Sequence, residues 1–212
     1  MNQNFVPKPV APSSKMVAPN DPASQFPQPR SVAPLMDPQQ LVRQFMILGD
    51  LLNAGTLLVD VRRTDYEGGT IRGSLNLPAQ SFPLNMSTLF RLCAGDGLAV
   101  ISRVVFYCGS SNGRGPRCAG WFMDYVQERC QMMEMPPTPQ VFVLDGGIKG
   151  WALRGEPFTH FMDVYVPSYW QQFSDQRTGV KRVGNEEQGA SQSKRSRDEE
   201  GAEEGDQNSM AM

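Results

Sequence analysis

The residues best suited to chemistry lie in one short stretch, where Arg114 follows six positions after Cys108. Two glycines and three small polar residues stand between them: Gly109, Ser110, Ser111, Asn112 and Gly113. Such a stretch lets a tight loop turn its backbone N–H groups inward as a nest for an anion. The guanidinium of Arg114 adds a planar fork that suits a tetrahedral oxyanion. The sequence therefore predicts an oxyanion-binding loop that begins with a nucleophilic cysteine.

The segments on either side of this loop would position it. Residues 104–107 form an apolar run of strand length, and a helix is expected from about residue 116 to residue 130, with Pro116 in its first turn. In parallel sheets, ligands bind beyond the carboxyl ends of the strands. The positive end of the helix would favour both a bound anion and the thiolate of Cys108. A buried structural cysteine is the simpler alternative, but this context favours the nucleophile.

The remaining segments alternate between strand-like and helix-like patterns. Further strands are expected at residues 56–61, 71–77 and 141–144. Further helices are expected from Asp37-Pro38 to Gly55 and over residues 84–92. This order predicts an α/β fold, in which helices cover both faces of a central parallel sheet.

Composition divides the chain into three parts. Residues 1–36 are rich in proline and polar residues, and we expect them to be disordered. Residues 37–172 hold most of the apolar residues and form one domain, and residues 173–212 form a disordered charged tail. The net charge is −2, and no apolar run reaches the length of about 18 residues that would span a membrane. We therefore expect a cytoplasmic protein that binds neither nucleic acid nor a membrane.

The charged tail carries two basic clusters, at residues 181–182 and 194–197, ahead of an acidic run at residues 198–206. Two clusters at this spacing resemble a bipartite nuclear-import signal, which would add an import receptor as partner and the nucleus as a location. A solvated tail with balanced charge is the alternative, and the sequence leaves both open.

The other soft metal ligands are scattered. Cys93, Cys118 and Cys130 fall within helical patterns, and we expect them to lie in the core as reduced thiols. The single histidine, His160, is distant from them in sequence. No metal site is expected, because structural zinc needs closely paired ligands.

Three motifs in register resemble one family. The loop from Cys108 to Pro116 resembles that of the rhodanese-fold dual-specificity phosphatases of the cell-division-cycle type and of the eukaryotic arsenate reductases. Residues 59–76 resemble the first half of rhodanese domains, and residues 144–151 resemble their Leu-x-Gly-Gly-x-x-x-Trp segment. The resemblance implies a rhodanese-like fold over about residues 37–160.

The resemblance also implies a reaction. Cys108 would attack phosphotyrosine-type monoesters and form a phosphocysteine, while Arg114 and the loop bind the oxyanion. The closely related arsenate reductase activity would need glutathione or another thiol donor, and no other cofactor is implied. The substrate would be a phosphorylated protein or a small oxyanion.

Two alternatives remain open. One is a sulfurtransferase, although its loops have six residues and this loop has seven, from Cys108 through Arg114. The other is a module that binds phosphoprotein without turnover. It is kept open by Tyr107, which stands where the family's phosphatases have a histidine.

Other positions differ or are ambiguous. Val61 replaces the second cysteine of the cell-cycle phosphatases, and the loop holds no acidic residue. Asp60 and Arg62 match a pair that ties family loops together. By family position, the candidates for a general acid are Asp65, Glu67 and Asp145, each with a structural or solvated role as the simpler alternative.

Overall fold

The computed structural model describes residues 26–94 and 101–178. The elements in chain order are β1 (Leu35–Met36), α1 (Pro38–Leu48), β2 (Thr56–Asp60), β3 (Thr70–Ile71), β4 (Leu75–Asn76), α2 (Phe82–Ala94), β5 (Arg103–Tyr107), α3 (Arg114–Met132), β6 (Gln140–Leu144), α4 (Gly147–Ala152), the 3-10 helix η2 (Thr159–Phe161), β7 (Met162–Asp163) and α5 (Pro167–Thr178).

Five strands form a parallel sheet in the order β1-β6-β5-β2-β4. The central strand β5 is paired on both sides along its length, with β2 and with β6. Its residues Val104, Val105 and Phe106 are fully buried, as expected for a strand covered on both faces. The predicted α/β fold with a central parallel sheet is confirmed.

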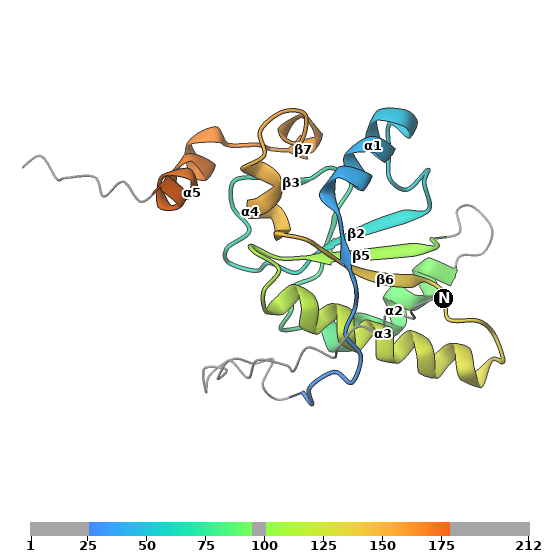
Figure 1. The fold of residues 1–212 in the computed structure, drawn as a ribbon. Coiled ribbons are helices and arrows are strands. Elements are labelled where there is room, and N and C mark those ends of the chain that lie inside the picture. The colour runs from blue at the N-terminus through green and yellow to red at the C-terminus, as the bar shows by residue number, and fades with distance from the viewer. Residues whose placement is uncertain (1–25, 95–100, 179–212) are drawn as a thin grey trace, which may run out of the picture. The chain divides into compact units, whose positions relative to one another are not determined.

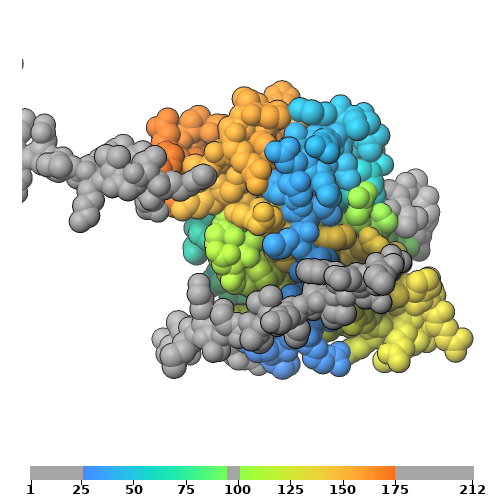
Figure 2. Space-filling model, in the orientation of Figure 1, coloured from blue at the N-terminus to red at the C-terminus, as the bar shows by residue number. Residues whose placement is uncertain are grey.

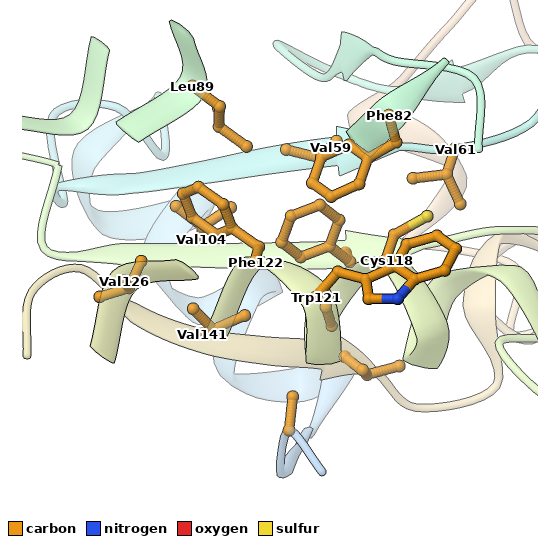
Figure 3. Close-up of a cluster of buried hydrophobic side chains, with 14 of the residues drawn as sticks. Val59, Val61, Phe82, Leu89, Val104, Cys118, Trp121, Phe122, Val126 and Val141 are labelled. Carbon is orange, nitrogen blue, oxygen red and sulfur yellow. The ribbon is translucent and has the colours of Figure 1, made fainter. Parts of the chain in front are cut away.

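Helices cover the two faces of this sheet (Figure 1). One face packs against α2 and α3, and Figure 3 shows that core. The labelled side chains there come from the sheet strands and the chain just after β2 (Val59, Val61, Val104, Val141), from α2 (Phe82, Leu89) and from α3 (Cys118, Trp121, Phe122, Val126). The other face packs against α1 and α4, through Leu41, Phe45, Ile148 and Trp151.

Two expected elements need correction. The first helix ends at Leu48, because Gly49 adopts a left-handed conformation there, and Gly55 lies beyond a turn. The carboxylate of Asp37 caps the start of this helix as predicted. The strand expected at residues 71–77 is two short strands in different sheets, since β3 pairs antiparallel with β7 and β4 pairs with β2.

The domain begins earlier than residue 37. The carbonyl of Pro27 accepts a hydrogen bond from the Trp121 indole at 2.7 Å, and the Asp124 carboxylate accepts from the amides of Arg30 and Ser31. Strand β1 then pairs with β6. Figure 2 shows this segment, in blue, on the surface between α3 and α1. Residues 26–36 are thus part of the domain. Their partners are the indole and the carboxylate on α3, and the scattered apolar residues of this segment gave no sign of these contacts in the sequence.

At the other end, the expected boundary at residue 172 falls inside α5. Residues 1–25, with most of the expected N-terminal segment, and the basic clusters at residues 181–182 and 194–197 lie outside the described residues. No helix in the described ranges is long and apolar enough to cross a membrane.

Candidate active site

The stretch from Cys108 to Gly113 follows β5 directly and leads into α3, at the carboxyl edge of the parallel sheet. The helix begins at Arg114, two residues before the expected start. Its N-cap residue Gly113 offers no side-chain hydrogen bond to the first amides of the helix. These amides therefore keep their capacity to bind an anion.

Helix α4 holds the loop from one side. The amide of Ile148 donates to the carbonyl of Cys108 at 3.1 Å, and the amide of Lys149 donates to that of Gly109 at 2.9 Å. In a trans peptide the N–H points opposite to the C=O, so the amides of Gly109 and Ser110 face away from α4. In the part of the chain that the structure describes, no amide from residue 109 to residue 113 donates to a protein acceptor. Several backbone donors of the loop are thus available to a ligand.

Side chains around the loop differ in exposure. Cys108 is 4% exposed, while Ser110, Asn112 and Gly113 face solvent. Ser111 has a positive φ of 54° and is buried, and its hydroxyl has no hydrogen-bond partner among the described residues. Burying a hydroxyl without a hydrogen-bond partner costs free energy, so the Ser111 hydroxyl is suited to bind an oxygen of a ligand.

Arg114 is bound by a carboxylate that is distant in sequence. Its Nη1 donates to Oδ1 of Asp65 at 2.7 Å, and its Nη2 donates to Oδ2 of the same residue. Hydrogen bonding from Arg114 holds the pKa of Asp65 at about 2, and the same contact raises the pKa of Arg114. Asp65 is therefore an ionised carboxylate paired with Arg114 at neutral pH, which fits a structural role and not that of a proton donor.

A buried ion pair holds the segment that carries Asp65. Arg62 and Asp60 are essentially inaccessible to solvent, and Nη2 of Arg62 lies 2.7 Å from Oδ2 of Asp60. The same guanidinium donates to the carbonyls of Glu67 at 3.0 Å and Gly69 at 2.8 Å, and to that of Asp65 at 3.4 Å. The guanidinium thereby ties together the loop between β2 and β3, in agreement with the architectural role expected for this pair.

Tyr107 ties the end of β5 to the next segment. Its buried hydroxyl lies 2.8 Å from Oγ1 of Thr70 and 2.7 Å from Oγ of Ser74, and it accepts from the amide of Ile71 at 3.3 Å. Burial raises the pKa of this hydroxyl above its usual range, so it stays neutral. Tyr107 therefore connects the loop's first strand to residues 70–74 through a satisfied polar network.

The other expected residues differ in their exposure to solvent. The Asp145 side chain is exposed after β6, and the side chain of Glu67 is exposed as well. Cys93, Cys118 and Cys130 are buried in the core, as predicted. No group of three or more candidate ligands for a metal ion occurs among residues 26–94 and 101–178.

Sequence reasoning missed α5, which packs beside the segment that carries Asp65. The indole of Trp170 donates to the carbonyl of Gly68 at 2.7 Å, and the ammonium of Lys149 lies 4.2 Å from the ring centre of Phe173. The aromatic residues Tyr169, Trp170 and Phe173, following the helix-starting Pro167, were the available signal.

Comparison with known proteins identifies relatives of this chain. Over 114 residues the chain is 34% identical to Arsenate reductase 2.1 of rice (Oryza sativa subsp. japonica), covering 53% of this chain and 66% of that protein. Over 123 residues it is 30% identical to human M-phase inducer phosphatase 1, covering 56% of this chain and 22% of that protein. The match thus spans less than two thirds of either relative.

Among solved structures, a yeast protein tyrosine phosphatase of the rhodanese family superposes with a TM-score of 0.52 at 25% identity. The match covers 66% of this chain and 99% of the yeast chain. The sequence model of the rhodanese-like domain family matches residues 47–154. This range is about half of the chain and includes both the loop and Asp65. The chain therefore belongs to the rhodanese-like domain family.

Proposed function

We propose that this protein is a cysteine-dependent phosphatase that hydrolyses phosphotyrosine-type monoesters. The observation that carries the proposal is the seven-residue loop from Cys108 through Arg114, set between the central strand β5 and the start of α3. Its free amides, the first turn of α3 and the guanidinium together make a cradle for a tetrahedral dianion. The relatives that carry phosphatase names share this family and support the same reading.

In the proposed reaction, the thiolate of Cys108 attacks phosphorus in line with the leaving oxygen. A sulfur–phosphorus bond forms as the bond from phosphorus to the alcohol or phenol oxygen breaks. Arg114 and the amides of residues 109–113 stabilise the charge on the equatorial oxygens. Water then attacks the phosphocysteine, releasing phosphate and restoring the thiolate.

The leaving oxygen does not receive its proton from Asp65, since that carboxylate is ionised beside Arg114. A leaving group of low pKa, such as the phenol of phosphotyrosine, needs this proton less than an aliphatic alcohol does. The proposal therefore favours aryl over alkyl phosphates.

Arsenate reduction is the second candidate, and the identity to the rice arsenate reductase favours it. Arsenate has the same tetrahedral shape and charge as phosphate, so the same cradle would bind it. Cys108 would displace an oxygen of arsenate as water and form a sulfur–arsenic bond. A thiol donor such as glutathione would then attack the Cys108 sulfur, so that the sulfur–arsenic bond breaks, arsenite leaves with the electron pair and a mixed disulfide remains, which a second thiol reduces.

One set of assays separates the candidates. The purified full chain is given a small aryl phosphate, arsenate with glutathione, or thiosulfate with cyanide, and kcat/KM is compared. A phosphatase turns over the aryl phosphate most efficiently, and efficient use of arsenate alone would assign the second candidate. Turnover of thiosulfate alone would instead indicate a sulfurtransferase. Oxyanion binding with no turnover of any substrate would indicate a binding module.

A further inference from the structure

The contact between Asp65 and Arg114 brings together two residues that are 49 positions apart in the chain. Both oxygens of the carboxylate are used, one with each terminal nitrogen of the guanidinium. A paired arrangement of this kind fixes orientation as well as distance, which a single hydrogen bond does not. The contact therefore restricts how the arginine side chain can rotate.

The carboxylate is itself held in place. The amide of Arg63 donates to Oδ1 of Asp65 at 3.2 Å, and the guanidinium of Arg62 reaches the Asp65 carbonyl. Arg62 in turn is anchored by the buried carboxylate of Asp60. A continuous series of contacts thus runs from a buried ion pair through the loop after β2 to the guanidinium of Arg114.

The geometry of the guanidinium leaves room for a ligand. Arginine has five N–H donors in one plane, and an end-on pair with a carboxylate uses one hydrogen on each terminal nitrogen. Nε–H and the second hydrogen of the adjacent terminal nitrogen then form another parallel pair along the neighbouring edge. Arg114 can therefore hold Asp65 and a tetrahedral oxyanion at the same time, through two different edges.

We propose that Asp65 is a positioning residue, which holds the guanidinium of Arg114 so that its free edge meets the oxyanion bound by the loop. This inference rests on the proposed function, because it assigns Arg114 to the oxyanion. Asp65 acts through Arg114 and does not touch the reacting atoms. Without the carboxylate, Arg114 loses the ordering that the pair provides, and misplacement by about 1 Å can lower a rate by as much as 100-fold.

The structure also allows an opposite role, which the experiment must separate. If the oxyanion needed the same edge of Arg114, Asp65 would compete with it and weaken binding. The contacts of Asp65 favour the positioning role. A competing carboxylate would have to leave Arg114 each time an oxyanion binds, whereas hydrogen bonds from Arg63 and Arg114 hold the Asp65 carboxylate in place.

The experiment measures the dissociation constant of tungstate, a tetrahedral oxyanion, for the full chain, together with kcat and KM for an aryl phosphate. The variants are Asp65→Asn, Asp65→Glu and, as a matched control, Asp163→Asn. Asp163 is also partly exposed and paired with an arginine, Arg72, at 3.4 Å, but it lies on β7 and its arginine is not the one that ends the loop. Arg114→Ala, alone and combined with Asp65→Asn, completes a double-mutant cycle.

Positioning predicts that Asp65→Asn lowers kcat/KM roughly 10- to 100-fold and weakens tungstate binding. Asp65→Glu should recover part of the loss, and Asp163→Asn should match the wild type. In the Arg114→Ala background, Asp65→Asn should change kcat/KM and the tungstate affinity little further. A general loss of folding would instead lower both quantities in either background. Additive losses in the cycle would overturn the inference.

Two other results are equally informative. Tungstate binding by Asp65→Asn that is equal to that of the wild type, or tighter, would overturn the positioning role but leave the proposed function standing. Tighter binding would also establish that Asp65 competes with the oxyanion for Arg114. Tungstate binding without turnover by the wild type would refute the proposed enzyme, yet the affinities would still decide the role of Asp65. Failure of the wild type to bind tungstate would overturn the oxyanion site and the role of Asp65 together.

Discussion

Gly147 offers a direct test of how α4 supports the oxyanion loop. Its φ of 58° lies in the left-handed region, and a Cβ there would sit 2.5 Å from the carbonyl oxygen of Cys108 and 2.8 Å from that of Gly109. The same Cβ would be 2.9 Å from the amide nitrogen of Ser111. All three atoms belong to the loop backbone, so the side chain of alanine can be accommodated only if the loop moves away from α4.

The cost of Gly147→Ala has two parts. Alanine in a left-handed conformation costs about 1–2 kcal/mol, and overpacking typically costs about 1–3 kcal/mol. Together these terms predict a loss of about 2–5 kcal/mol, or about 4–20 °C in Tm at about 2–4 °C per kcal/mol for a domain of this size. Gly155 has a φ of 69° with nothing within 4 Å of its Cβ position. Gly155→Ala therefore isolates the backbone part and should cost about 1–2 kcal/mol.

The assay combines urea unfolding with tungstate binding for both glycine variants. We expect Gly147→Ala to lose more stability than Gly155→Ala and to bind tungstate more weakly, because the loop amides no longer converge. Gly155→Ala should keep the affinity of the wild type. Equal losses of stability in the two variants, together with normal tungstate binding by Gly147→Ala, would contradict the support of the loop by α4.

The remaining predictions concern the residues around the loop. Tyr107→Phe removes a hydroxyl that three groups contact, and urea unfolding should show a loss of about 1–3 kcal/mol. Arg62→Met leaves the Asp60 carboxylate buried without its partner, and urea unfolding should show a loss of roughly 3–5 kcal/mol in stability. A loss below about 1 kcal/mol would contradict the burial of this ion pair. Because the pKa of Asp65 is lowered to about 2, its contact with Arg114 stabilises the fold above the unfolded pKa and loses that effect as pH falls toward 2. Asp65 is 42% exposed, so the difference between wild type and Asp65→Asn at pH 6 should stay within about 1 kcal/mol and shrink between pH 4 and pH 2; a difference that grew on acidification would contradict this contact.

The sheet and the loop could be predicted because their signals are local. Buried parallel strands read as apolar runs, as in residues 104–107, and a glycine- and serine-rich stretch before a helix start is a recognisable pattern. Helix ends were harder, since Leu52 fits the helical spacing of Leu41 and Phe45 but lies in a turn after Gly49. From the sequence alone, either Gly49 or Gly55 could end this helix. In the structure the helix ends at Gly49, which adopts the left-handed conformation.

The contacts that complete the site could not be predicted from spacing. Asp65 was expected by family position to be a general acid or a structural or solvated carboxylate. Its partner Arg114 could not be named, because pairing across 49 residues depends on how the loop after β2 folds back. The packing of Pro27 on Trp121 and of Trp170 on Gly68 is likewise long-range, so spacing along the sequence did not reveal that these segments contact the rest of the domain.

The proposed reaction depends on Cys108 as the nucleophile of an oxyanion-binding loop. Its most direct test is rapid quenching of the full chain with an aryl phosphate, followed by mass spectrometry of the peptide that contains Cys108. We predict a phosphate adduct on Cys108, with steady-state turnover lowered by about 10⁴-fold or more in Cys108→Ser and by about 10²- to 10³-fold in Arg114→Ala. Turnover that persists in Cys108→Ser, or an adduct on another residue, would contradict the claim.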